Sequence, residues 1–237
     1  MKKNLSLTII LLAAVIVLSG FLFLFLRADC LFKENKNMAI SEEIIKLPEP
    51  RKDSDFSLER AINERRSVRS YTAEKISLAE ISQLLWASQG LTSETKRAAP
   101  SAGALYPMEI YAVGAFGDYE AGIYHYQPQS HSLARLKSGD FRPVLSEIGL
   151  SQRWIEKAPL NLVVTGVVSR TAAKYGERAG QYVALEAGHV GQNIYLQAEA
   201  LGLGTVAVGA FDDEQMAELF SFEESQKAYY IFPVGHK

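Results

Sequence analysis

The stretch Lys174-Tyr175-Gly176-Glu177-Arg178 says most about the fold and chemistry of this 237-residue chain. A lysine and a tyrosine, both able to exchange protons, adjoin in a glycine-containing segment that we expect to be a loop. We expect a helix rich in glycine and alanine over 180–201, followed by Gly202-Leu203-Gly204-Thr205. Small residues on a helix let another backbone or a flat ring approach closely. This order of features suits proton transfer beside a buried flat cofactor.

The composition defines the broad class of the protein. The chain is 48% hydrophobic and 22% charged, which is enough apolar content for an ordinary core. A formal net charge of -2 gives no general attraction to nucleic acid, so we expect no nucleic-acid partner. The single cysteine, Cys30, excludes an intrachain disulfide and a cysteine-cluster metal site. The histidines form no H-x-x-x-H pair, and we therefore expect no metal.

Residues 1–26 predict a membrane anchor. From Leu5 to Leu26 the chain carries no charge, and a helix of this length spans about 33 Å, enough for the core of a bilayer. The apolar run continues to Arg27 without a small-residue cleavage site, which favours an uncleaved anchor over a secretory signal. The basic residues on its two sides are nearly balanced, but two lysines in the short N-terminal head favour an inside N-terminus. This orientation would place the rest of the chain outside the cytoplasm.

The remaining chain divides into a short polar segment and one domain. Residues 27–55 contain Pro48-Glu49-Pro50, and we interpret them as a linker or an arm lying on the domain of 56–237. The expected helices of this domain are 57–66, 77–90, 141–148, 154–157, 180–201 and 212–220. The expected strands are 109–113, 122–126, 160–168, 204–208 and 228–234. Because strands and helices do not alternate regularly, we expect an α+β fold rather than a doubly wound parallel sheet.

Two short motifs could bind an anionic or flat ligand. A basic cluster at the end of the first expected helix consists of Arg65, Arg66, Ser67 and Arg69. Its guanidinium groups and hydroxyl could hold a phosphate, although arginines at this place could also complement the helix dipole. The second motif is the small-residue loop Pro100-Ser101-Ala102-Gly103, which precedes a strand. Its main-chain N–H groups could approach a ligand closely, although a plain connecting loop shows the same pattern.

Two further glycine patterns are a run that resembles a dinucleotide-binding motif and a small-residue face on the long expected helix. The run from Gly202 to Ala207 matches G-x-G-x-x-A, but it follows an expected helix and opens a strand, so we reject a Rossmann interpretation. The long expected helix carries Ala184, Gly188, Gly191 and Ala198 near one face. Glycine inside a helix costs about 1 kcal/mol relative to alanine, so these positions suggest that a partner helix or a ring packs very close. Close packing within one subunit would need the same residues.

The lysine–tyrosine pair also has two interpretations. A partly desolvated lysine has a lowered pKa and can act as a base, so Lys174 is a candidate general base. Tyr175 could relay or donate a proton. The alternative is a solvated lysine beside a tyrosine that only packs.

Taken together and in order, several segments resemble the nitroreductase superfamily and, within it, the SagB-type dehydrogenases. The resemblance covers 47–237. Its segments are Arg65-Arg66-Ser67-Val68-Arg69-Ser70-Tyr71, Leu84-Leu85-Trp86-Ala87-Ser88-Gln89-Gly90, Pro100-Ser101-Ala102-Gly103-Ala104-Leu105-Tyr106-Pro107, Lys174-Tyr175-Gly176-Glu177-Arg178, Leu185-Glu186-Ala187-Gly188-His189, Ala198-Glu199-Ala200-Leu201-Gly202-Leu203-Gly204-Thr205 and Pro233-Val234-Gly235.

The resemblance implies an FMN-binding α+β fold with a central, mainly antiparallel sheet flanked by helices. It also implies a homodimer with flavin sites at the subunit interface. The basic cluster would hold the phosphate and ribityl chain, the small-residue loop would adjoin the isoalloxazine, and a later segment would lie near its N5 edge. The implied cofactor-binding residues are Arg65, Arg66, Ser67, Arg69, Pro100, Ser101, Ala102, Gly103, Val208 and Gly209. Many members end in basic residues that reach the phosphate, and here His236 and Lys237 take that position.

The resemblance also implies a reaction. In azoline-oxidising members a lysine–tyrosine pair is catalytic, and it corresponds to Lys174 and Tyr175. Those enzymes oxidise peptide thiazolines or oxazolines: a base takes a proton while flavin takes a hydride. The membrane anchor is atypical for enzymes of cytosolic precursor peptides, so the substrate could be a peptide or a small molecule. The alternatives are an NAD(P)H-dependent reductase of nitro or quinone compounds, and a non-catalytic, membrane-bound docking subunit.

Overall fold

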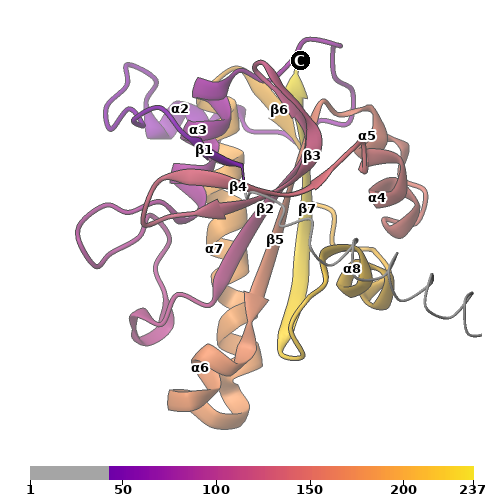
Figure 1. Ribbon diagram of the computed structural model, residues 1–237. Coiled ribbons are helices and arrows are strands. Elements are labelled where there is room, and N and C mark those ends of the chain that lie inside the picture. The colour runs from indigo at the N-terminus through magenta and orange to yellow at the C-terminus, as the bar shows by residue number, and fades with distance from the viewer. Residues whose placement is uncertain (1–42) are drawn as a thin grey trace, which may run out of the picture. The chain divides into compact units, whose positions relative to one another are not determined.

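The computed structural model describes residues 43–237, and an antiparallel sheet forms their centre (Figure 1). The strands are β1 (Ile44–Lys46), β2 (Met108–Phe116), β3 (Tyr119–Gln127), β4 (Ser132–Ser138), β5 (Leu160–Val167), β6 (Leu203–Thr205) and β7 (Gln226–His236). They form one seven-stranded sheet in the order β1-β4-β3-β2-β5-β7-β6. Every neighbouring pair is antiparallel. The α+β class and the antiparallel sheet expected from the sequence are confirmed.

Helices cover both faces of the sheet (Figure 1). One layer contains α2 (Leu58–Glu64), α3 (Leu78–Gln89), α6 (Val168–Tyr175) and the long α7 (Ala179–Ala200). The other contains α4 (Arg142–Ile148), α5 (Arg153–Lys157) and α8 (Asp213–Phe220). Short 3-10 turns are η1 (Ala102–Ala104) and η2 (Gly176–Arg178).

The central strands are buried on both faces, which explains their continuous apolar sequences. In β7, Ile231 packs with the α4, α5 and α8 layer, whereas Phe232 packs with α3 and α7. Val163 and Val164 of β5 divide in the same way. Because successive side chains of a strand point to opposite faces, each face of the sheet has its own hydrophobic core. The larger of these cores lies beneath α7.

Local sequence signals define the helix ends. Ser77 and Glu80 form the expected capping box at the start of α3, and Ser57 caps α2. α3 ends at Gly90, close to the helix end expected from the sequence. Its φ of -65° is ordinary, but a Cβ at this position would lie 2.4 Å from Cδ1 of Trp86. Gly90 is therefore required by lack of space rather than by a left-handed backbone.

Several elements differ from the sequence-based expectation. β4 and α6 were not expected, so Lys174 and Tyr175 lie in the last turn of a helix and not in a loop. Gly176 follows at φ +54° and ends this helix. The strand expected over 204–208 is shorter, because β6 stops at Thr205 and Val208 pairs with Ile231 only as an isolated bridge.

The N-terminal expectations fall largely outside the described residues. The anchor over 1–26 lies there, together with the first part of the linker or arm. Within the described part of that arm, Ile44–Lys46 forms β1 and pairs with β4 at the sheet edge. Across residues 43–237, the helices are too short or too polar to span a membrane.

Candidate functional site

The basic cluster lies where the chain leaves α2 and meets the end of the sheet. Ser67 pairs with Thr205 of β6 in a short parallel bridge, and the Val68 N–H donates to the Thr205 carbonyl at 2.9 Å. A Cβ at Gly204 would lie 2.7 Å from Cγ1 of Val68. Gly204 therefore lets β6 approach the basic cluster closely.

The three arginines of the cluster have different surroundings. The guanidinium of Arg65 lies 5.0 Å from the ring centre of Tyr195, and that of Arg69 lies 5.5 Å from the ring centre of Trp154. Arg66 instead donates to the main-chain oxygens of Asn63 and Arg65, at 2.8 and 2.7 Å. Arg66 thus caps the end of α2. Across residues 43–237 none of the three is in an ion pair, so the charges of Arg65 and Arg69 are not neutralised by a carboxylate there.

Tyr195 of α7 connects the basic cluster to the segment that contains Val208 and Gly209. Its hydroxyl accepts the Ala207 N–H at 2.8 Å and shares a hydrogen bond with Ser67 Oγ at 3.0 Å. Gly209 is exposed just beyond this contact. Our sequence reasoning missed Tyr195. Its one signal is a hydroxyl-bearing ring directly after the buried Ile194 of the long helix.

The two C-terminal residues lie in different surroundings. The stem of Lys237 packs near Gly204, and its Nζ lies 2.7 Å from Oε1 of Glu199. The His236 Nε2 lies 3.6 Å from Oε1 of Glu80 at the start of α3. Lys237 is therefore adjacent to the basic cluster with its charge already paired, whereas His236 faces a carboxylate.

The small-residue loop and the lysine–tyrosine pair meet in space. Gly103 has φ +64°, and a Cβ there would lie 3.0 Å from both Lys174 Nζ and Tyr175 OH. Tyr175 also packs edge-on against Tyr182, with ring centres 4.9 Å apart. Ser101 accepts the Tyr106 N–H at 2.9 Å, which closes the loop. The structure thus brings together two motifs that are separated by about seventy residues in sequence.

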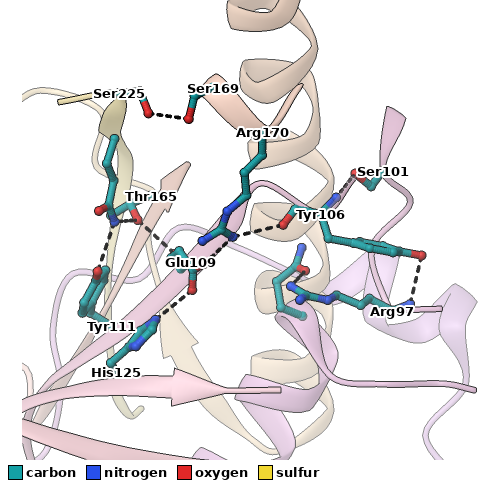
Figure 2. Close-up of polar contacts among 12 residues, drawn as sticks. Arg97, Ser101, Tyr106, Glu109, Tyr111, His125, Thr165, Ser169, Arg170 and Ser225 are labelled. Carbon is teal, nitrogen blue, oxygen red and sulfur yellow. Dashed lines mark hydrogen bonds and ion pairs between the residues drawn. The ribbon is translucent and has the colours of Figure 1, made fainter. Parts of the chain in front are cut away.

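A polar network leads away from this loop (Figure 2). Arg170 of α6 contacts Oε1 of Glu109 at 2.5 Å, and His125 Nε2 lies 2.8 Å from Oε2 of the same carboxylate. The Arg170 Nη1 also donates to the Tyr106 carbonyl at 3.5 Å. Burial alone would raise the pKa of Glu109, but the hydrogen bond to His125 and the charge of Arg170 hold it below its usual range. Sequence reasoning did not find this network.

A second acidic residue is buried beneath the loop. Glu186 of α7 is 3% exposed, and its Oε1 has no hydrogen-bond partner in the described part of the chain. Burial raises the pKa of Glu186 to about 7, although the Ser101 hydroxyl and the Arg97 charge partly oppose the rise. Arg97 is itself held by Gln89 Oε1 at 3.0 Å.

The loop and the basic cluster lie on opposite sides of α7. Glu186 adjoins Ser101 of the loop, whereas Tyr195 adjoins Ser67 of the cluster. The two α7 residues are nine positions apart, which corresponds to about 13 Å and about two and a half turns. They therefore project from opposite sides of the helix.

A third side of α7 is exposed, and no other element of residues 43–237 packs over it. Its exposed residues are Gln181, Ala184, Leu185, Gly188, His189 and Gln192. Leu185 is 55% exposed, and a Cβ at Gly188 would meet no atom within 4 Å. Gly191 differs, because a Cβ there would lie 2.9 Å from Phe232. The small residues expected on one face are thus divided between the core and this open surface.

Comparisons with known proteins agree with this geometry. The profile described as Nitroreductase family matches residues 62–236. A nitroreductase-family protein of Methanocaldococcus jannaschii is 40% identical over 185 residues, which cover 77% of this chain and 92% of that protein. The crystal structure of a nitroreductase-family protein of Ralstonia eutropha superposes with a TM-score of 0.73 and 28% identity, over 83% of this chain and 90% of that one.

A third relative is more distant. The microcin B17-processing protein McbC of Escherichia coli is 27% identical over 143 residues, which are 57% of this chain and 52% of that protein. The family profile covers most of the chain, and the match to the archaeal protein covers 92% of that protein's length. This chain belongs to the nitroreductase family and is an FMN-dependent oxidoreductase.

Proposed function

We propose that the protein is a SagB-type dehydrogenase in which Lys174 or Tyr175 removes a proton from a substrate carbon. The observation that carries this proposal is the position of Lys174 Nζ and Tyr175 OH against Gly103. FMN, when bound, accepts the hydride that leaves the substrate at the same time. The substrate loses one proton and one hydride, so its carbon framework gains a double bond. The similarity to a microcin-processing protein supports a peptide azoline as the substrate class.

The residues of the basic cluster fit a phosphate-bearing flavin. Arg65 and Arg69 are free of carboxylate partners within residues 43–237 and flank Ser67 in sequence. They would hold the phosphate, with Lys237 adjacent. The loop would lie along the ring, and the missing side chain of Gly103 would let Lys174 Nζ and Tyr175 OH come close to the loop there. Val208 pairs with Ile231 through an isolated bridge, and the segment of Val208 and Gly209 would approach the ring edge.

A homodimer explains why the two halves of the expected flavin site face opposite sides of α7. Two-fold symmetry is the commonest arrangement of soluble oligomers. Pairing the uncovered side of α7 with its symmetry mate can place the loop of one subunit on the same side as the basic cluster of the other. One elongated flavin would then reach both. The open surface at Gly188 supports this pairing.

An NAD(P)H-dependent reductase of nitro or quinone compounds is the second candidate. It is supported by the 40% identity to a nitroreductase-family protein. Such an enzyme receives hydride directly from the nicotinamide and needs no base at Lys174. The third expectation, a non-catalytic docking subunit, is not supported, because the family consists of FMN-dependent oxidoreductases.

An anaerobic flavin-reduction experiment separates the two enzymatic candidates. The full-length protein, purified in mild detergent and loaded with FMN, is mixed either with a short peptide that contains one thiazoline or with NADPH. We expect the thiazoline peptide to bleach the visible absorbance of the flavin faster than NADPH does. Rapid bleaching by NADPH alone would favour the reductase. A protein that cannot be loaded with FMN would contradict both candidates.

A further inference from the structure

The helix that carries the lysine–tyrosine pair packs mainly on α7 and buries few of its own residues. α6 has eight residues, no side chain caps its start, and Thr171 is its one fully buried residue. Its C-terminal end, with Lys174 and Tyr175, stops at Gly176. A short helix with this little buried surface frays easily, because most helical stability in proteins comes from tertiary packing. The edge-on packing of Tyr175 on Tyr182 holds one side of its last turn, and a polar contact from the same helix can add to that support.

Arg170 supplies such an interaction. Its Nη1 lies 2.5 Å from Oε1 of Glu109 and 3.5 Å from the Tyr106 carbonyl, so it contacts the chain directly after the small-residue loop. Arg170 and Lys174 are four residues apart, and residues at this spacing lie on the same face of a helix. One face of α6 thus contacts the start of β2 through Arg170 and reaches Gly103 through Lys174.

Glu109 is a well-anchored partner for this arginine. Its second oxygen lies 2.8 Å from His125 Nε2, and the His125 ring stacks on Tyr111 with centres 4.8 Å apart (Figure 2). The Thr165 hydroxyl donates to the main-chain oxygen of Glu109 at 3.3 Å. The side chain of Glu109 is 16% exposed. Its hydrogen bond to His125 and the charge of Arg170 keep its pKa low, so the carboxylate is charged at neutral pH.

We propose that Arg170 and Glu109 form a positioning clamp that holds Lys174 and Tyr175 against the small-residue loop. The catalytic meaning of the clamp rests on the proposed function, but the placement of α6 does not. A partly exposed ion pair contributes little to global stability, so loss of the clamp should displace the last turn of α6 without unfolding the domain. Arg170 acts through its neighbours and is a positioning residue.

Amide hydrogen exchange on the full-length, FMN-loaded protein tests the placement. Arg170→Met and Glu109→Gln should each increase exchange at residues 171–176 by at least about tenfold, with little change in α3 and α7. Arg135→Met is the matched control, because it removes the comparable Arg135–Glu43 pair of 2.7 Å at the far edge of the sheet. The control should leave α6 unchanged. Unaltered exchange of α6 in both clamp variants would overturn the proposal.

The chemical reactivity of the Lys174 amine tests whether Arg170 positions Lys174 or only supports the fold of α6. Trace labelling with acetic anhydride, followed by peptide mass spectrometry, gives the acetylation of Lys174 relative to Lys157, which is exposed as Lys174 is. We expect this ratio to change at least about threefold in Arg170→Met and to stay constant in Arg135→Met. Faster exchange with an unchanged ratio would make Arg170 a purely structural contact. Failure of the wild type to bind FMN would overturn the proposed function alone, since both measurements also work on flavin-free protein.

Discussion

At the scale of single residues, Gly103 lies where the proposed flavin-binding loop meets the proposed base. Its left-handed backbone, φ +64°, and missing side chain leave room for Lys174 Nζ and Tyr175 OH. A Cβ at Gly103 would lie 3.0 Å from each group, so Lys174 Nζ and Tyr175 OH reach the same part of the loop and either could act as the base. The identity of the base is therefore best tested at Lys174.

Lys174→Ala should slow substrate-driven flavin reduction by about 10²–10⁴-fold, the usual contribution of general-base catalysis. FMN affinity should change little, because the basic cluster lies on the other side of α7. Stopped-flow absorbance with the thiazoline peptide measures the rate, and Lys157→Ala at an exposed position serves as control. Equal rates in the wild type and Lys174→Ala, with any competent donor, would remove Lys174 from the mechanism and favour the reductase.

The arginines of the basic cluster should differ in their effect on FMN binding. Arg65→Ala or Arg69→Ala removes a charge-assisted contact, and each should weaken binding by about 1.5–3 kcal/mol. Arg66→Ala should lose less, because its guanidinium is occupied by the carbonyls at the end of α2. Titration of flavin fluorescence gives the three dissociation constants. A larger loss for Arg66→Ala than for the other two would contradict this assignment.

The buried Glu186 should make stability depend on pH. Its pKa in the folded protein, about 7, lies above the usual value near 4.5, so the folded state holds a proton that the unfolded state has lost. Stability therefore falls as pH rises between these values. Glu186→Gln should gain on the order of 1–2 kcal/mol at pH 8 and almost nothing at pH 4, as measured by urea unfolding.

Glu109→Gln provides the opposite case. The pKa of Glu109 is lowered, so its ionised form stabilises the fold at neutral pH and this contribution is lost as pH falls. The Glu109→Gln variant should be less stable than the wild type at pH 7, and the difference should shrink at pH 4.

For the Glu186 prediction, a pH-independent effect of Glu186→Gln would show that burial does not control the ionisation of Glu186.

At the scale of elements, α7 determines how the site is organised. Its buried side packs on the sheet, one flank adjoins the loop, the opposite flank adjoins the basic cluster, and a third side has no cover within residues 43–237. Leu185 and Gly188 lie on that uncovered side. The helix is thus both the main support of the core and the expected subunit contact.

Gly188→Leu should separate the homodimer and release flavin, because a leucine side chain would hold the paired helices apart. Light scattering after gel filtration measures the mass, and the visible spectrum of the eluted protein measures bound FMN. Glu147→Leu adds an exposed leucine on α4, in the other helical layer, and should remain dimeric. A strictly monomeric wild type that retains FMN would contradict the proposed dimer.

At the scale of the whole molecule, the sequence predicts a membrane anchor ahead of the domain. We expect residues Leu5 to Leu26 to keep the full-length protein in membranes after a high-salt wash, because the attachment is hydrophobic rather than ionic. Immunoblots of washed membrane and supernatant fractions measure this. A mature N-terminus downstream of residue 20 in the supernatant would indicate a cleaved signal.

The sequence alone determined the features that depend on neighbouring residues. The capping box of Ser77 and Glu80, the apolar run of β5 and the periodicity of α7 are local signals, and the corresponding elements were predicted correctly. The ordered motifs also predicted the family. α6 was missed because it is short, mostly polar and follows β5 directly, so it does not stand out as a separate helix. β4 was missed because only its sheet neighbours explain its pattern.

Only the tertiary structure decided which distant residues meet. Arg170 and Glu109 are sixty-one positions apart, and nothing near either residue in sequence specifies the other. The convergence of Lys174 on Gly103 depends on how α6 packs beside the sheet. Burial of its apolar side fixes how α7 is rotated about its own axis. This rotation places the loop and the basic cluster on opposite sides of the helix. Long-range packing, which local sequence patterns do not encode, therefore built the candidate site from motifs that the sequence had already revealed.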